Sequence, residues 1–170
     1  ARRSLLRTLA VLLALAGAPL HAQLPDLERG KLALASGDFA AAKRDLVPLA
    51  NQGYLEAQLR LASAYGRLET PDGDREAARW YRAALSKAPE LKVRLARRLL
   101  RLAEPAAPGG DAATPPSPPD AGQTKLLDEA EKLLRQADRA GDAEALLPLL
   151  GLLTAHPARD QEPRQTVASL

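Results

Sequence analysis

The feature that most constrains this chain is a set of small and apolar positions that recurs at helical spacing in three segments. The second set follows the first by 35 residues. A period near 35 residues that contains two helices is typical of TPR-like solenoids. The chain is therefore expected to be all-α, a right-handed solenoid of antiparallel helix pairs. The three sets are Ala42, Leu46 and Leu49; Ala77, Tyr81 and Ala84; and Ala130, Leu134 and Ala137.

The third set follows the second by 53 residues, and composition explains the longer interval. Residues 105–122 hold six of the 14 prolines, and such a segment buries too little apolar surface to order itself. A flexible loop inserted in the repeat is therefore expected there. The predicted organisation is a secretion signal peptide at 1–22, helical repeats at 23–104, the loop at 105–122, a further repeat at 123–156 and a tail or truncated repeat at 157–170.

Residues 1–22 have the organisation of a secretion leader. Three arginines precede an apolar run from Leu9 to Ala16, and a turn-prone segment ends at Ala22. The apolar run is shorter than the ~18 residues that a membrane span needs. The alternative interpretation is a buried N-terminal helix. The chain contains no Met, so it also fits a fragment of a longer protein.

Capping residues and turn residues predict where the helices begin and end. Aspartates are expected at N-caps, where a side-chain oxygen accepts from a free backbone N–H, and glycines at C-terminal ends, where the backbone turns left-handed. A turn is expected at 70–73, and a kink or an early end at Pro48 and Pro148. The predicted caps are Asp26, Asp38 and Asp74, the terminating glycines are Gly37 and Gly53, and the helices are 27–35, 39–50, 54–66, 75–86 and 90–103.

Aromatic residues make up only 3% of the chain, so the core must be built mainly from Leu and Ala. Trp80 and Tyr81 have two interpretations. The area that each ring can bury favours the repeat core, and the alternative is a platform on which a sugar ring stacks. The predicted core positions are Ala42, Leu46, Leu49, Ala57, Leu61, Tyr65, Ala77, Trp80, Tyr81 and Ala84.

Charge and residue content exclude several classes of function. Of 24 basic and 21 acidic residues, three basic and no acidic ones lie in 1–22, so the remainder is neutral and nucleic-acid binding is not expected. The absence of Cys excludes disulfides and thiol catalysis. Asp72, Asp74 and Glu76 lack the spacing of a calcium loop and are expected to serve the helix start, and His156 is expected to be exposed in the tail. We therefore expect no catalytic residue, metal or cofactor.

A basic stripe is the one candidate binding surface. Arg94, Arg97, Arg98 and Arg101 follow the spacing i, i+3, i+4, i+7 and so share one face of a helix. The favoured interpretation is a solvated face that pairs with acids from neighbouring helices. The alternative is a contact surface for a partner or for a polyanion such as a polyuronate, because clustered charge concentrates ligands of the opposite sign.

Two segments resemble known repeat helices. Residues 74–84 include a Trp-Tyr pair followed by Ala-Ala, and they are preceded by residues 57–66, which read Ala-Gln-Leu-Arg-Leu-Ala-Ser-Ala-Tyr-Gly. Together they resemble the second and first helices of a Sel-one-like repeat, a relative of the TPR repeat. The resemblance implies stacked helix pairs that present an extended surface to other proteins.

A wider resemblance covers about residues 24–155. Its markers are Leu24-Pro25-Asp26, Gly37-Asp38, Gly53-Tyr54, Glu56-Ala57-Gln58 and Leu147-Pro148-Leu149. Their order and spacing are similar to those of the alginate-export scaffold family of Gram-negative bacteria. The resemblance implies a periplasm-facing outer-membrane lipoprotein that helps to place the outer-membrane alginate porin and holds periplasmic alginate-modifying enzymes near it.

The chain departs from that family at its lipidation signal. Leu15-Ala16-Gly17 has the form of a lipobox, but Ala18 stands where lipidation requires Cys. The expected location is therefore the periplasm, beside the inner face of the outer membrane through protein partners and without a lipid anchor. The expected function is a non-enzymatic scaffold in exopolysaccharide export. The alternatives are a direct binder of alginate through the arginine stripe and a generic protein-binding TPR-like adaptor.

Overall fold

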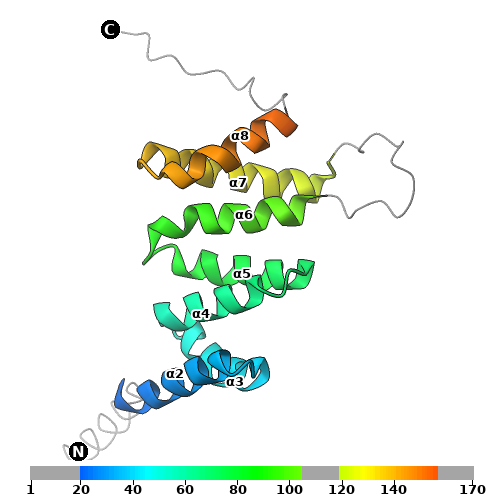
Figure 1. Cartoon of the computed structure of the whole chain (residues 1–170). Helices are drawn as coiled ribbons and strands as arrows, with labels where there is room; N and C mark the ends of the chain where they lie inside the picture. Colours follow the sequence, from blue (N-terminus) through cyan, green and yellow to red (C-terminus); the bar gives the residue numbers. More distant parts are fainter. Residues whose placement is uncertain (1–19, 105–118, 157–170) are drawn as a thin grey trace, which may run out of the picture. The chain divides into compact units, whose positions relative to one another are not determined.

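A computed structural model describes residues 20–104 and 119–156, with side chains from residue 25 onward. Every regular element within these residues is helical, which confirms the all-α prediction (Figure 1). The chain divides within α4, at residues 61 and 62, into two units that are described separately. The elements are α2 (Leu20–Ala35), α3 (Phe39–Asn51), α4 (Leu55–Gly66), α5 (Pro71–Ala84), η1 (Pro89–Leu91), α6 (Lys92–Ala103), α7 (Ala121–Arg139), η2 (Ala143–Ala145) and α8 (Leu146–Ala155).

The first unit is built on the pairing of α2 with α3. Gly37 makes the turn between them with a φ of 82°, a left-handed conformation that glycine adopts without strain. Asp38 then caps α3, as predicted, by accepting a hydrogen bond from the backbone N of Ala41 at 2.9 Å. Gly30 permits close packing, because a Cβ there would lie 2.5 Å from the side chain of the fully buried Leu46.

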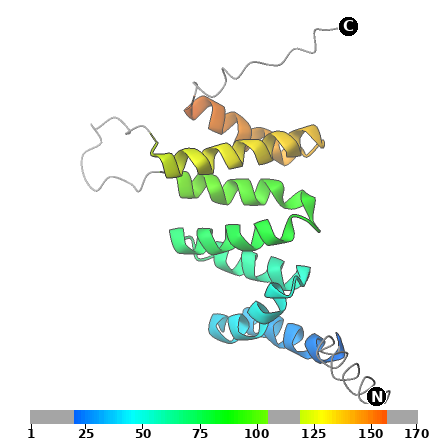
Figure 2. The same cartoon turned by 180° about the vertical axis from the view of Figure 1, so that it is seen from behind.

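In the second unit, α5, α6, α7 and α8 follow one another in chain order, with α6 between α5 and α7 (Figures 1 and 2). Leu95 and Leu99 on α6 are fully buried, as is Leu134 on α7. Asp120 caps α7 through a capping box with Gln123, in which each residue's side chain accepts from the other's backbone N–H.

Helix α5 begins one turn earlier than the sequence suggested. Thr70 is its N-cap, with the hydroxyl accepting from the backbone N of Gly73 at 3.1 Å, and Pro71 occupies the first turn. The predicted turn at 70–73 is therefore wrong, and so is the capping role of Asp74, which lies inside the helix. Asp26 is likewise inside α2, because that helix begins at Leu20.

The three related helices keep their buried register while their caps move. Ala42, Ala77 and Ala130 are each fully buried. They come four, seven and ten residues after their caps, which are Asp38, Thr70 and Asp120 respectively. In each successive helix, about one more turn thus separates the cap from the recurring buried alanine. The interval that relates the core positions therefore does not predict where the later caps lie.

The helix ends near the prolines, and the boundaries of the predicted loop and leader, differ from expectation. Helix α3 ends three residues after Pro48, at Asn51. Pro148 lies in the first turn of α8, where a backbone N–H has no partner within the helix, and α8 continues to Ala155. Helix α7 takes in residues 121 and 122 of the predicted loop, and α2 begins before the predicted cleavage after Ala22. Residues 1–19, 105–118 and 157–170, which hold most of the predicted leader, loop and tail, lie outside the described residues.

None of the helices within the described ranges has both the length and the apolar character required to cross a membrane.

Candidate functional site

The structure places most of the predicted core residues out of contact with solvent. Tyr65 is the exception, because its side chain is only partly buried. The buried positions line the contacts within each unit, and their small size permits close helix approach. They are Ala42, Leu46, Leu49, Ala57, Leu61, Ala77, Trp80, Tyr81 and Ala84.

Trp80 and Tyr81 occupy the interior of the second unit. Their side chains are 3% and 5% exposed, so neither ring offers a face on which a sugar could stack. The guanidinium of Arg79 lies over the Trp80 ring, 4.8 Å from its centroid. The indole N–H of Trp80 has no hydrogen-bond partner within the described residues. Trp80 therefore contributes through apolar packing and the cation–π contact.

Asp74 organises two members of the arginine stripe. It is 3% exposed on α5 and forms ion pairs with Arg98 at 3.0 Å and Arg101 at 3.1 Å, both from α6. Arg98 also donates to the carbonyl of Gly66 at 3.0 Å. A buried carboxylate is stable only where cations and hydrogen bonds replace its water. The ion pairs with Arg98 and Arg101 are therefore the main role of Asp74, and the sequence does not predict them. The Thr70-Pro71 pair is the sequence signal that the helix starts earlier.

The other two arginines of the stripe are more exposed. Arg97 pairs with Glu144 of η2 at 3.5 Å, through side chains that are 50% and 69% exposed. Arg94 has no hydrogen-bond or ion-pair partner among the described residues. The stripe thus divides into two arginines held by a buried acid and two that remain available to solvent.

The four arginines line a single pocket together with Tyr81. Its volume is about 360 Å³, and its described lining contains no carboxylate. We call it the arginine–tyrosine pocket; it is lined by Tyr81, Arg94, Arg97, Arg98 and Arg101. The Tyr81 hydroxyl accepts and donates no hydrogen bond among the described residues, and it is not sealed from solvent. This cationic cavity with one free hydroxyl is the candidate functional site.

The remaining acids near the start of α5 form local pairs. Asp72 pairs with Arg75 and Glu76 with Arg79, each three residues along the helix. These pairs are exposed and contribute little to stability. The described residues contain no group of three or more His, Cys, Asp or Glu side chains arranged to hold a metal ion.

A second buried acid lies in the first unit. Asp45 is 8% exposed and pairs with Arg29 at 3.2 Å and with Arg44 at 3.3 Å. The hydrogen bond from Arg29 lowers the pKa of Asp45 below its ordinary value, against the opposing effect of burial, and Arg44 adds to the lowering. Asp45 is therefore held charged, as a structural partner of two arginines.

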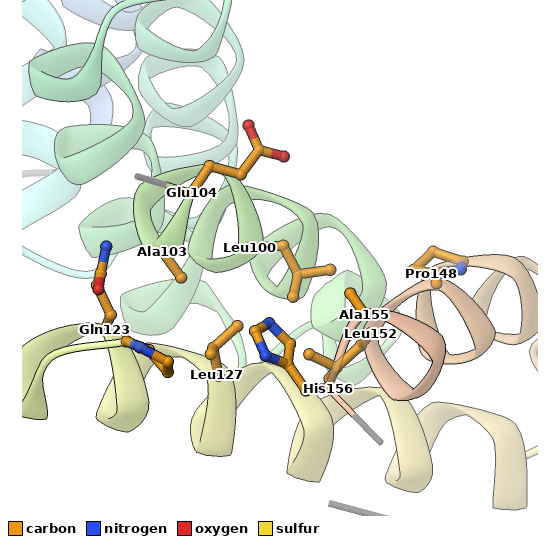
Figure 3. Close-up of a pocket in the computed structure, with 11 residues that line it drawn as sticks. Leu100, Ala103, Glu104, Gln123, Leu127, Pro148, Leu152, Ala155 and His156 are labelled. Carbon is orange, nitrogen blue, oxygen red and sulfur yellow. The ribbon is translucent and has the colours of Figure 1, made fainter. Parts of the chain in front are cut away.

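His156 is part of an apolar pocket, and the prediction that it is a simple exposed tail residue is wrong. Figure 3 shows its imidazole between Leu127 of α7 and Leu152 of α8. The pocket has a volume of about 480 Å³ and also includes Leu100 and Ala103 of α6. Its residues overlap the small core that joins α6, α7 and α8. The pocket offers shape and apolar surface but few polar groups that could orient a ligand.

Helix α8 exposes large apolar side chains on its outer side. Leu146, Leu147 and Leu150 are 55%, 81% and 60% exposed, whereas Leu152 on the same helix is buried. We call these three the α8 leucine face. Clustered exposed leucines are uncommon on isolated soluble domains and indicate a contact surface.

Comparison with known proteins gives a consistent set of relatives. The chain is 36% identical over 149 residues to the alginate biosynthesis protein AlgK of Pseudomonas putida, a match that covers 88% of this chain and 27% of that protein. It is 36% identical over 149 residues to AlgK of Azotobacter vinelandii, covering 86% and 29%. It is 33% identical over 140 residues to AlgK of Pseudomonas aeruginosa, covering 80% and 25%.

The chain therefore spans between 25% and 29% of the length of these curated relatives. No protein-family model matches it, so the assignment to Sel-one-like repeats stays a prediction. No solved structure matches it either.

Proposed function

This chain is an AlgK-like protein, and from that premise we propose that it is a non-catalytic helical scaffold that contributes to alginate biosynthesis. The observation that carries the proposal is the similarity to four AlgK proteins along most of this chain. The packing of its helices in adjacent pairs supports it, because stacked pairs present extended surfaces to partners.

The state of the buried acids supports a non-catalytic role. A general acid or base works best with a pKa near the operating pH. Asp45 is instead paired with two arginines, and the hydrogen bond from Arg29 lowers its pKa below the ordinary value. Asp74 is engaged in ion pairs with Arg98 and Arg101. His156 faces apolar side chains and has no hydrogen-bond or ion-pair partner for its imidazole among the described residues. These groups serve the fold better than they would serve proton transfer.

The proposed location is the periplasm, and the proposed partners are an outer-membrane polysaccharide porin and periplasmic polysaccharide-modifying proteins. The leader-like residues 1–22 and the resemblance to alginate-export scaffolds support this placement. The α8 leucine face supports protein binding, since exposed apolar clusters favour association in water.

Affinity capture tests the proposal. The tagged chain is incubated with envelope extract from an alginate-producing bacterium, and bound proteins are identified by mass spectrometry. We expect an outer-membrane porin or a periplasmic polysaccharide enzyme to be enriched. A variant with Leu147→Gln and Leu150→Gln should lose part of the enrichment. A matched control with Lys132→Gln and Asp138→Asn, at exposed positions of α7, should keep it. Enrichment of neither class would overturn the scaffold proposal.

A further inference from the structure

We propose that the arginine–tyrosine pocket binds the carboxylates of a polyuronate chain. Naming alginate as that polyuronate rests on the proposed function, whereas the choice of an anionic, carboxylate-bearing ligand rests on the pocket itself. The pocket brings four guanidinium groups and one free hydroxyl together around about 360 Å³, a volume within the range of ligand pockets.

The charge of the pocket is not cancelled by its own acids. Asp74 neutralises part of the charge of Arg98 and Arg101, and Glu144 makes one long, exposed contact with Arg97. Four arginines thus share two acids, and Arg94 has no partner among the described residues. The surplus positive charge inside a concave, partly enclosed space attracts anions more strongly than the same charge on a flat surface.

Two of the four arginines, Arg98 and Arg101, are held in place before a ligand arrives. Arg98 is held by both the Gly66 carbonyl and Asp74, each at 3.0 Å. Gly66 leaves room for it, because a Cβ at that position would lie 2.6 Å from Nη2 of Arg98. A guanidinium that is already oriented loses less freedom on binding, and its planar pair of donors matches a carboxylate.

Tyr81 gives the pocket a second, independent sign of ligand binding. Tyr81 is 5% exposed and lines the cavity together with the four arginines, and its hydroxyl has no hydrogen-bond partner among the described residues. A buried tyrosine normally satisfies its hydroxyl within the protein. The Tyr81 hydroxyl is not sealed from solvent, so a carboxylate or a sugar hydroxyl that binds in the pocket can replace water as its partner.

The test is calorimetric titration of the full chain with three probes at matched ionic strength. The probes are alginate oligosaccharides, neutral glucan oligosaccharides of the same length and inorganic sulfate. We expect binding of the alginate oligosaccharides, weakening as salt rises because exposed charges are screened, and no binding of the neutral glucan. Sulfate should compete only weakly, because it offers no chain of successive carboxylates.

Three variants separate the pocket from general electrostatics. Arg94→Gln with Arg97→Gln removes the two available arginines and should weaken alginate binding about tenfold or more. The matched control, Arg75→Gln with Arg139→Gln, removes the same charge elsewhere in the second unit and should change affinity less than about twofold. Tyr81→Phe should weaken binding about threefold to tenfold, which corresponds to one hydrogen bond, without changing the salt dependence.

The outcomes are distinct for this inference and for the scaffold proposal. Equal weakening by the pocket variant and its control, or unchanged affinity in Tyr81→Phe, would overturn the pocket as the site. Sulfate that binds as tightly as the oligosaccharide would overturn the polyuronate as its ligand. The capture of partners from an envelope extract does not depend on these titrations. The two experiments together therefore distinguish a scaffold that does not bind glycan from a glycan-binding chain that captures no partner. Circular dichroism and Trp80 fluorescence verify that each variant is folded.

Discussion

Arg82 on α5 and Glu129 on α7 form a two-pronged ion pair, with Nε and Nη2 of the arginine each 2.7 Å from one carboxylate oxygen. The two residues are 47 positions apart in the chain. The pair raises the pKa of the Arg82 guanidinium, first through the hydrogen bond to Glu129. It joins α5, which precedes residues 105–118 in the chain, to α7, which follows them.

We expect Arg82→Gln to destabilise the second unit modestly, because both side chains are more than a third exposed and water screens the pair. A double-mutant cycle with Glu129→Gln should give a coupling of about 0.5–1 kcal/mol, at the upper end for exposed pairs because the contact is two-pronged. Urea unfolding followed by Trp80 fluorescence measures it. A coupling near zero would show that the pair adds nothing to the junction.

Asp74 should be far more sensitive than its neighbour Asp72. Asp74→Asn leaves Arg98 and Arg101 without their shared carboxylate, and we expect a loss of about 2 kcal/mol, the scale of a charged hydrogen bond in a buried setting. Asp72→Asn is the matched control at an 88% exposed side chain and should change stability by less than about 0.5 kcal/mol. Similar losses in the two variants of the same helix would contradict the role assigned to Asp74.

Asp45 gives the first unit a component of acid sensitivity. Since the folded-state pKa of Asp45 is lowered, its ion pairs stabilise the fold above the ordinary carboxyl pKa, and that stability is lost as pH falls through the lowered value. The stability difference between the chain and its Asp45→Asn variant should therefore be constant near neutral pH and shrink below about pH 4. Thermal unfolding followed by circular dichroism from pH 7 to pH 2 measures it. If the stability difference stays constant from pH 7 to pH 2, Asp45 is not a source of the acid sensitivity.

The helix spans and the core residues could be predicted from the sequence because both follow from local periodicity. Ala42 and Ala77 are 35 residues apart, and both are fully buried. The capping residues were harder to predict from the sequence. A capping side chain interacts with only the next few residues, and its position does not follow the spacing of the core residues. Asp74 looked like a cap on the pattern of Asp38, while the true cap, Thr70, lay one turn earlier.

Only part of the candidate site could be predicted from the sequence. Helical spacing placed the four arginines on one face, but the acids that meet them come from other helices. The contact of Arg98 with Asp74 joins residues 24 positions apart, and no local pattern specifies it. The prediction that Tyr81 is buried is confirmed, but its place in the lining of the pocket follows only from the packing of α5 against α6.

Gly30 and Gly151 should respond in opposite directions to the same change. A Cβ at Gly30 would overlap the Leu46 side chain, so Gly30→Ala should cost about 1–3 kcal/mol by forcing α2 and α3 apart. Gly151 lies in α8 with nothing within 4 Å of such a Cβ, so Gly151→Ala should gain about 0.5–1 kcal/mol from its higher helix propensity. Chemical denaturation followed by circular dichroism compares them. Destabilisation of both would mean that α8 is packed more tightly than this open position indicates.

The α8 leucine face should govern association more than folding. Leu147 and Leu150 are 81% and 60% exposed, so their replacement removes little buried apolar surface. We expect Leu147→Gln with Leu150→Gln to change the free energy of unfolding by less than about 1 kcal/mol and to reduce concentration-dependent self-association and binding of a hydrophobic dye. Sedimentation velocity at several concentrations measures the association. The control is Leu152→Gln, which places a polar group at a 4% exposed position and should destabilise by several kcal/mol instead. If the exposed pair proved as destabilising as Leu152, the face would belong to the core of this chain and could not serve as a free contact surface.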